Sequence, residues 1–259
     1  MAEDAEGERI AIDQEAPEGW RPGAPGILQA LLEAEVRSVQ LAPDGSNYTF
    51  YAVLEHAAAG RWVGVYKPQR GEAPLWDFPS GTLYKREYGA YLVSEALGWG
   101  FIPPTVIRDG PYEVGTMQLF MPSVRGANYF TLREERAADL QRFAAFDAFT
   151  NNADRKGSHC LLGLDGRLWG IDHGLCFNVE HKLRTVIWDF QGDPVPGPLL
   201  ADLRRLLEGL TGGGDIVAQL RDLIHVSELD MLKRRLEALV REGLYPPPGM
   251  RRSVPWPPV

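Results

Sequence analysis

One stretch of the sequence, from Asn151 to Gly174, brings together the residue types that metal-assisted transfer to a hydroxyl group requires. It reads NNADRKGSHCLLGLDGRLWGIDHG. Asp154 supplies a carboxylate that could orient a hydroxyl group or take its proton. Asp172 and His159 supply an oxygen ligand and a nitrogen ligand for a divalent cation. The alternative interpretation is an ordinary surface hairpin with scattered polar residues.

The spacing within this stretch predicts how the two ligands meet. Asp165-Gly166 is a strong signal for a two-residue type I′ turn, because both central positions of that turn need positive φ. With these residues at the turn, counting outward along the ladder places His159 opposite Asp172. Directly opposed residues have Cβ atoms about 4.5–5.5 Å apart. We therefore expect the imidazole and the carboxylate to share one face and to hold a metal ion or a water between them.

The same stretch resembles the catalytic loop and metal motif of the phosphatidylinositol 3- and 4-kinase-like branch of the protein-kinase fold. The resemblance rests on DRKGSH followed by IDHG, and HipA-type and actin-fragmin-kinase-type enzymes belong to the same broad group. It implies that Asp154 is the catalytic Asp, with Arg155 as its loop neighbour. It also implies that Asp172 binds the metal that accompanies a nucleotide.

The sequence departs from the family pattern at three positions. Lys156 replaces the usual His, His173 replaces the usual Phe, and His159 stands where the family has its metal-binding Asn. A neutral imidazole still ligates a divalent cation, but nitrogen suits manganese, zinc or iron better than magnesium. The resemblance therefore implies ATP with Mg²⁺ or Mn²⁺ and does not decide between the two metals.

A kinase-like fold needs a Lys on an upstream strand and a Glu on the following helix. The run Arg61–Gln69 alternates as a strand does, and it carries Lys67 as the candidate for the α- and β-phosphates. The run Thr82–Leu97 has helical periodicity and stops before a glycine. On that helix Glu87 lies in line with aromatic residues and is expected to pair with Lys67, with Glu95 as the competing choice.

Two further segments supply candidates for nucleotide binding. The run Glu35–His56 predicts a hairpin whose turn reads DGSN, where Ser46 and Asn47 are candidates for cradling phosphate oxygens. The same turn is also a common plain turn. The run Thr105–Ser123 predicts two strands, the second of which leads to a hinge.

The resemblance implies that adenine binds at this hinge, through backbone groups and apolar side chains. The candidates are Gln118, Phe120 and Met121. A plain core strand is the alternative, because runs of Met and Phe occur more often in cores than in cofactor pockets.

The predicted fold class is α+β, a bilobal protein-kinase-like fold with an antiparallel sheet and one helix in the N-lobe and a mainly helical C-lobe. A core helix over 138–152 would deliver Asp154, and two or three amphipathic helices are expected between 197 and 242. The expected regions are a disordered acidic leader at 1–25, an N-lobe at 26–122, a C-lobe at 123–245 and a Pro-rich tail at 246–259.

Two segments beside the predicted site are expected to pack rather than to bind substrate. The insert at 70–81 is interpreted as a loop pinned by Trp76 and Phe78. The segment Cys176–Pro196 occupies the place of an activation segment. Its Lys182 and Arg184 could gather an anionic acceptor, but its large apolar residues favour docking on the C-lobe.

Bulk properties exclude several classes of protein. The 259 residues carry a formal net charge of −8 without a basic stripe, which disfavours nucleic-acid binding. No apolar run approaches the roughly 18 residues of a membrane span, and the first 25 residues lack the apolar segment of a signal peptide. The two cysteines, Cys160 and Cys176, fit a reducing cytoplasm. A zinc site that combines them with His159 and His173 is disfavoured, since Cys160 should point away from His159.

The sequence thus predicts a cytoplasmic, ATP- and divalent-metal-dependent phosphotransferase that moves the γ-phosphate to a hydroxyl acceptor. Protein, lipid headgroup and small molecule all stay open as acceptors, because acceptor pockets are built from loops that no motif encodes. The alternatives are a pseudokinase that binds nucleotide or acts as a scaffold, and nucleotidyl transfer on the same fold. The sequence is silent on oligomeric state.

Overall fold

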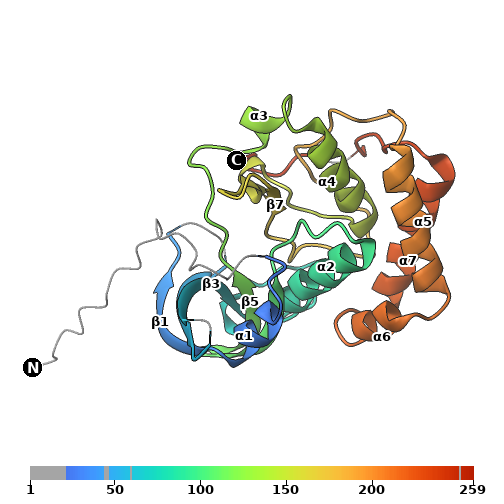
Figure 1. Ribbon diagram of the computed structural model, residues 1–259. Coiled ribbons are helices and arrows are strands. Elements are labelled where there is room, and N and C mark those ends of the chain that lie inside the picture. The colour runs from blue at the N-terminus through green and yellow to red at the C-terminus, as the bar shows by residue number, and fades with distance from the viewer. Residues whose placement is uncertain (1–21, 44–46, 59, 251) are drawn as a thin grey trace, which may run out of the picture. The chain divides into compact units, whose positions relative to one another are not determined.

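The computed structural model describes residues 22–43, 47–58, 60–250 and 252–259. By its internal contacts the chain divides into two compact units (Figure 1). The first, which we call the sheet unit, comprises Met1–Pro74 and Pro104–Pro122, and the second, the helical unit, comprises Leu75–Pro103 and Ser123–Val259. Most of the predicted acidic leader and the candidate Ser46 lie outside the described residues.

The sheet unit is built on a five-stranded antiparallel sheet. Its strands, in the order β1-β2-β3-β5-β4, are β1 (Glu35–Leu41), β2 (Phe50–His56), β3 (Gly60–Pro68), β5 (Glu113–Leu119) and β4 (Thr105–Gly110). The predicted hairpin over 35–56, the strand carrying Lys67 and the two strands over 105–123 are all confirmed. The antiparallel ladders need only short connections, and β4 and β5 are joined by two residues.

The two faces of this sheet differ in character. One face buries Leu54, Trp62 and Tyr66 and is covered by a helix that the sequence reasoning missed, α1 (Ile27–Glu33). Arg108 ties this helix to β4, donating to the carbonyl oxygens of Leu31 at 2.9 Å and of Ala34 at 2.7 Å. Side chains alternate along a strand, so the opposite face carries Lys67, Gln118 and their cross-strand partners.

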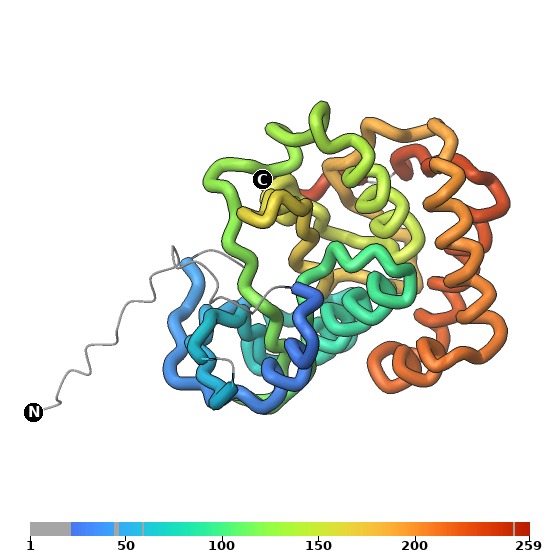
Figure 2. The backbone as a smooth tube through the Cα atoms, in the orientation of Figure 1, coloured from blue at the N-terminus to red at the C-terminus, as the bar shows by residue number. Residues whose placement is uncertain are grey.

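The helical unit holds the other helices and a short hairpin. Its elements are α2 (Leu83–Leu97), α3 (Tyr129–Leu132), α4 (Ala137–Thr150), β6 (Cys160–Leu162), β7 (Leu168–Gly170), α5 (Gly197–Thr211), α6 (Asp215–Arg221) and α7 (Val226–Glu242). Figure 2 shows the chain running from α4 through the hairpin before it enters α5 to α7. The expected amphipathic helices between 197 and 242 are confirmed, as are the helix before Asp154 and the helix after Thr82.

Helix α2 begins and ends where the sequence signals placed it. Gly98 caps it in the left-handed conformation at φ 72°, and its N–H donates to the Glu95 carbonyl. The helix contacts α5 and α6, which groups it with the helical unit rather than with the sheet. Its buried side chains include Tyr91 and Val93, which join the large apolar core of that unit.

The Pro-rich tail packs along the helical unit. Immediately before the tail, the buried Tyr245 donates its hydroxyl to the Gln141 carbonyl at 3.0 Å. Further on, the Ser253 carbonyl accepts from the Thr185 N–H at 3.0 Å, and the Pro258 carbonyl accepts from the Gly157 N–H at 2.7 Å. The end of the chain therefore lies beside the loop that contains Asp154 (Figures 1 and 2).

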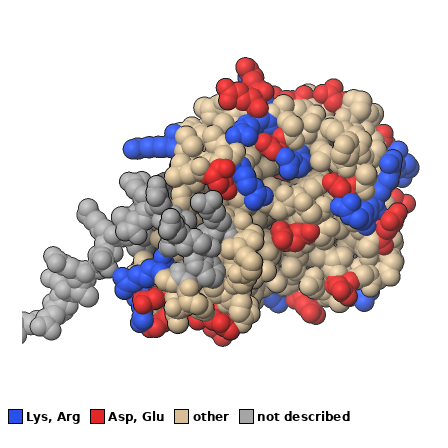
Figure 3. Space-filling view, in the orientation of Figure 1, with Lys and Arg blue, Asp and Glu red and all other residues tan. Residues whose placement is uncertain are grey.

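The drawn surface (Figure 3) carries charges of both signs. Acidic and basic side chains are interspersed on the face drawn in Figure 3. Within the described part of the chain, no helix combines the length and the apolar character needed to cross a membrane.

Candidate active site

The β6–β7 hairpin closes through a three-residue loop, so the predicted two-residue type I′ turn is wrong. The Gly163 N–H donates to the Arg167 carbonyl at 2.9 Å, and the Gly166 N–H donates back to the Gly163 carbonyl at 2.9 Å. Gly166 alone takes a left-handed conformation, at φ 77°. This is a type I turn followed by a left-handed residue. Asp165 caps the turn by accepting from the Arg167 N–H at 3.0 Å, the local side-chain-to-backbone contact that Asp makes in turns.

The ladder is consequently shifted by one residue from the predicted register. Its strand pairs are Cys160 with Gly170, Leu161 with Trp169 and Leu162 with Leu168. The Ile171 N–H donates to the His159 carbonyl at 3.1 Å, so His159 lies opposite Ile171 and not opposite Asp172.

His159 and Asp172 meet nevertheless, for a different reason. Asp172 leaves the ladder with φ at 60°, a conformation that costs a non-glycine residue about 1 kcal/mol or more. The His159 Nε2 atom then lies 3.4 Å from the Asp172 Oδ2 atom. Backbone strain is thus located at the residue that the sequence assigned to the metal.

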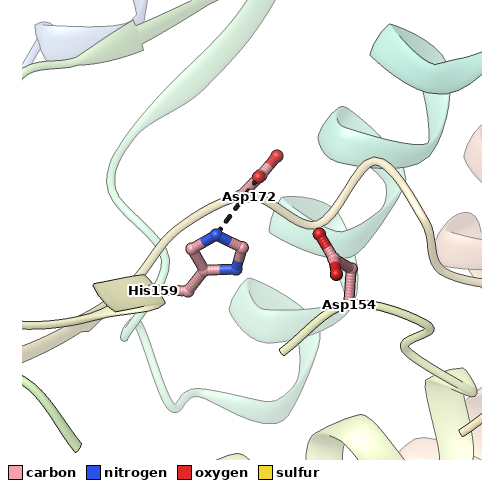
Figure 4. A group of neighbouring side chains, drawn as sticks. All are labelled: Asp154, His159 and Asp172. Atoms are coloured by element: carbon pink, nitrogen blue, oxygen red, sulfur yellow. Dashed lines mark ion pairs between the residues drawn. The ribbon is translucent and has the colours of Figure 1, made fainter. Parts of the chain in front are cut away.

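Asp154 completes a group with these two side chains, which we call the trio. One ligand atom from each of Asp154, His159 and Asp172 lies within 4.8 Å of the others, as Figure 4 shows. Two ligands on opposite sides of a cation at about 2.1 Å are roughly 4.2 Å apart. Small side-chain movements would therefore bring the three atoms to ligating distances.

Asp154 is placed by the end of α4. The helix stops where Asn151 turns left-handed at φ 58°, and the side-chain oxygen of Asn152 accepts from the Asp154 N–H at 3.0 Å. Burial raises the pKa of the Asp154 carboxyl group, and the nearby Asp172 raises it further, whereas Lys156 lowers it. Two carboxylates that share a small space attract a cation.

Lys156 is a functional candidate that the sequence reasoning treated only as a departure. Its Nζ atom lies 3.3 Å from the Asp154 Oδ2 atom, and both side chains are about one quarter exposed. The sequence signal was its position two residues after Asp154, which places a cation on the same short loop. Lys156 keeps positive charge beside the carboxylate.

Arg155 lies in the core rather than beside the trio. Its guanidinium is fully buried and forms an ion pair with the equally buried Asp147, at 3.0 Å between Nη2 and Oδ1. It also donates to the Ile171 carbonyl at 3.0 Å. Asp147 further accepts from the Asn152 side-chain amide at 2.9 Å and from the Thr185 hydroxyl at 3.3 Å. We call these side chains, Asp147, Asn152, Arg155 and Thr185, the Arg155 network.

This network also fixes His173, the residue that stands in place of the family's Phe. The Arg155 Nη2 atom lies 2.6 Å from the His173 Nε2 atom. Because a guanidinium only donates, Nε2 must accept, which assigns the ring proton to Nδ1 and makes the imidazole neutral. Arg155 therefore holds both sides of the loop beneath Asp154 and Asp172.

Glu87 connects helix α2 to the metal motif. Its side chain is buried, and its Oε2 atom accepts from the His173 N–H at 2.9 Å. Glu95, the competing choice, is exposed on the same helix. Of the two acidic residues, Glu87 is the one that reaches the neighbours of Asp172.

The nucleotide candidates of the sheet unit lie on or beside one face of the sheet. Lys67 is half-buried on β3 and pairs with Thr116 on β5. Gln118 is buried on the same face, and its side-chain amide donates to the Thr105 hydroxyl at 2.9 Å. Phe120 follows β5, and its ring meets that of Tyr51 edge to face at 5.7 Å.

The other two candidates of this unit have mainly packing contacts. Met121 is buried beyond the end of β5. The side-chain oxygen of Asn47 accepts from the Ala73 N–H at 2.7 Å, which ties Asn47 to the segment after β3.

The segment after the hairpin docks on the helical unit, as predicted. The Arg155 N–H donates to the Arg184 carbonyl at 3.0 Å, and the Val186 N–H donates to the Arg155 carbonyl at 3.1 Å. Val186 and Ile187 are buried in the main core. Lys182 forms an ion pair with Asp77 in the insert.

The insert itself is pinned by one aromatic residue, so the prediction for Trp76 is wrong. Phe78 is buried against Leu83 and Ala153, next to Asp154. Trp76 is 92% exposed, and its contact is with the Lys182 ammonium, 4.5 Å from the ring centroid, rather than with the core.

The structure does not assemble the zinc alternative. In the described ranges, the trio is the only group of three or more His, Cys, Asp and Glu side chains close enough to share one ion. Cys160 and Cys176 are free thiols in the core, and burial raises the pKa of Cys160 to about 12. A thiol that stays protonated is a poor metal ligand.

Comparison with solved structures defines the class of the molecule. No protein-family model matches the sequence. The structure of hydra Fam20 with sugar has a TM-score of 0.56 at 16% identity and covers 84% of this chain and 86% of its own. The Helicobacter pylori proinflammatory kinase CtkA has a TM-score of 0.50 at 11% identity and covers 83% and 94%. The chain therefore has a protein-kinase-like fold of the α+β class, as predicted.

Sequence comparison then gives the family. Protein Rv2133c of Mycobacterium tuberculosis is 40% identical over an alignment of 228 residues, and the match covers 74% of this chain and 81% of that protein. The chain belongs to the family of Protein Rv2133c. Phosphatidylinositol 4-kinase gamma 4 of Oryza sativa subsp. japonica is 27% identical over an alignment of 122 residues, and the match covers 40% of this chain and 22% of that protein.

Proposed function

We propose that this protein is an ATP- and divalent-metal-dependent phosphotransferase that moves the γ-phosphate to a hydroxyl acceptor. The observation that carries the proposal is the convergence of Asp154, His159 and Asp172 within 4.8 Å of one another. Asp154 and His159 follow helix α4, and Asp172 follows β7, in a protein-kinase-like fold. The similarity to a phosphatidylinositol 4-kinase supports placing the chain in the phosphatidylinositol 3- and 4-kinase-like branch. We expect a protein, lipid headgroup or small molecule of the cytoplasm as acceptor.

Asp154 is the proposed catalytic carboxylate. It must be ionised to accept the acceptor's proton, and burial opposes ionisation by raising its pKa. The Lys156 ammonium at 3.3 Å counteracts this effect, so we assign Lys156 to keeping Asp154 charged. Arg155 acts through the Arg155 network as a positioning residue.

Asp172 and His159 are the proposed metal ligands. One carboxylate oxygen and one imidazole nitrogen fit Mn²⁺ better than Mg²⁺, and both metals need few protein ligands when phosphates supply the rest. A divalent cation held there would provide positive charge against the phosphate oxygens. The side chain of His159 is only 9% exposed, so its ring has little freedom to turn away from Asp172.

The nucleotide is proposed to lie on the face of the sheet that carries Lys67. Lys67 is assigned to the α- and β-phosphates, with Glu87 as its partner. Gln118, Phe120 and Met121 are assigned to the adenine end. The half-buried Phe120 and Tyr51 rings offer the apolar surface that a purine ring requires.

The test is transfer from ATP labelled at either the α- or the γ-phosphate, with Mn²⁺ or Mg²⁺ present, scoring both self-labelling and hydrolysis. The proposal expects γ-label release or transfer by the parent protein and its loss in Asp154→Ala and Asp172→Ala. Asp230→Ala, which alters an exposed carboxylate of α7, is the matched control. Transfer of the α-label would indicate nucleotidyl transfer, and nucleotide binding without either reaction would indicate a pseudokinase. Unchanged γ-transfer in both alanine variants would contradict the site assignment.

A further inference from the structure

A pocket of about 190 Å³ lies in the helical unit, away from the trio. It is formed where the tip of the β6–β7 hairpin, at Gly166 and Arg167, faces the start of α4. Asp172 follows the other, open end of the same hairpin. Asp172 is five positions after Arg167 along the strand, so the two places are roughly 15 Å apart.

Three arginines converge on this pocket, which we call the arginine pocket. Arg136 donates to the Gly166 carbonyl at 2.8 Å. Arg167 donates to the Gly100 carbonyl at 2.7 Å and its guanidinium stacks on Trp169, 4.3 Å from the ring centroid. Arg142 pairs with Asp139. Each guanidinium is therefore held in place by the protein, while most of its five donors lie outside these contacts.

The charge of the lining is unbalanced. Asp139 is the one carboxylate among the lining side chains, and both Arg142 and Arg136 share it, the latter at 3.7 Å. Glu95 on α2 also interacts electrostatically with Arg167, but it lies outside the lining of the pocket. Asp165 is engaged by the Arg167 N–H and the Trp169 indole. Positive charges that are held close together repel one another, and a bound anion relieves that repulsion.

The size and floor of the pocket limit the ligand. Sites for drug-sized ligands span about 300–1,000 Å³, so about 190 Å³ suits a small anion rather than a whole nucleotide. Guanidinium groups bind phosphate through paired donors. Trp99, Phe101 and Phe143 are buried beneath the arginines and form the floor of the pocket.

We propose that the arginine pocket binds a small phosphate dianion, either free or as a small monoester. Such a ligand joins the hairpin tip to the start of α4. These two elements continue to Asp172 and to Asp154, so binding stabilises the helical unit that holds the trio. The anchored arginines make the site pre-organised, which reduces the ordering that binding requires.

The experiment measures binding of inorganic phosphate to the full chain by calorimetry and by thermal unfolding, in EDTA, without nucleotide and at constant ionic strength. Arg142→Gln and Arg167→Gln are the test variants. Arg204→Gln changes an exposed arginine of α5 and is the control for general charge effects. Asp172→Ala, measured alongside, reports any binding at the trio. Because no ATP or metal is present, the result is independent of the proposed phosphotransferase activity.

We expect each test variant to bind phosphate about 10- to 100-fold more weakly, as loss of a charged hydrogen-bonding partner implies. Arg204→Gln and Asp172→Ala should bind as the parent does, and phenyl phosphate should bind the parent more tightly than inorganic phosphate if a monoester is the natural ligand. Circular dichroism confirms that each variant is folded. Equal binding by all variants, loss of binding in Asp172→Ala, or absence of binding to the parent protein would overturn the proposal.

Discussion

Two neighbouring sets of polar residues around the loop that follows α4 differ in how far their side chains are buried. The Arg155 network lies wholly in the core: both Asp147 and Arg155 have no exposed side-chain surface. The trio lies at the edge of the same loop, where Asp172 is 46% exposed and Asp154 is 25% exposed. The chain alternates between the two sets, because Asp154 and Arg155 are adjacent in sequence.

The difference separates support from chemistry. The buried Arg155 network saturates its charges internally, as polar groups in a low-dielectric interior must. The trio instead gathers two carboxylates and an imidazole around a point that a cation can reach. A residue of the Arg155 network should therefore affect stability first, and a residue of the trio should affect activity first.

The largest expected effect is the loss of activity in Asp172→Ala. Removing a charge that stabilises the transferring phosphate should lower γ-phosphate transfer at least about 10³-fold. The melting temperature should stay close to that of the parent, because the loss of a repulsive carboxylate offsets the poorer tolerance of alanine for φ 60° at this position. Calorimetric unfolding and labelled-ATP turnover measure the two quantities. A large fall in both the transfer rate and the melting temperature of this variant would contradict the distinction between the two sets.

Arg155→Met, in contrast, should mainly lower the stability of the protein. It leaves the buried Asp147 carboxylate without its counter-charge, which should lower the free energy of unfolding by about 3–5 kcal/mol. Urea unfolding measures the change. The double variant Asp147→Leu with Arg155→Met should recover part of the loss, since no charge is then left alone in the core. No recovery in the double variant would show that the pair is not the source of the effect.

An intermediate effect is expected at Glu87. Glu87→Ala leaves the buried His173 N–H without its acceptor, which should cost about 1–3 kcal/mol of stability. Glu87→Gln keeps an oxygen for that N–H and removes only the charge, so it should be nearly as stable as the parent. If Glu87 also pairs with Lys67, Glu87→Gln should still raise the KM for ATP, and Lys67→Met should add little to that change. Additive effects on KM would exclude the pairing.

The smallest expected effect is the pH dependence of stability set by Asp154. Burial raises its pKa above the ordinary value of 3.8, so the folded state binds a proton more readily than the unfolded chain. The stability from this group is complete below pH 3.8 and is lost as the pH rises through the raised pKa. Asp154→Asn should therefore be more stable than the parent at pH 7, with the gain vanishing at low pH. Urea unfolding at several pH values measures it, and a gain that grows on acidification would contradict it.

The sequence predicts the order of the parts well because strong local signals mark each of them. Strand alternation placed Lys67, the glycine after Leu97 placed the end of α2, and helical periodicity placed the helix before Asp154. These are patterns within single elements, and tertiary packing did not alter them.

Features that depend on side-chain competition were not predictable. The carboxylate of Asp165 caps its own turn, so the ladder moved by one residue. His159 and Asp172 still meet, but only through the positive φ of Asp172, which no propensity encodes. The ring of Trp76 contacts the Lys182 ammonium, which lies more than a hundred positions later in the sequence. Helix α1 was missed because seven residues are too few to show a helical periodicity.

The most direct test of the central claim is to measure Mn²⁺ binding at the trio by electron paramagnetic resonance, in the presence of a non-hydrolysable ATP analogue. The account predicts that the parent binds Mn²⁺ with an imidazole nitrogen in its coordination shell, that Asp172→Ala loses binding, and that His159→Asn loses the nitrogen signal and shifts the preference towards Mg²⁺. Asp230→Ala should bind as the parent does. Equal Mn²⁺ affinity in the parent and Asp172→Ala, with no nitrogen ligand in either, would contradict the account.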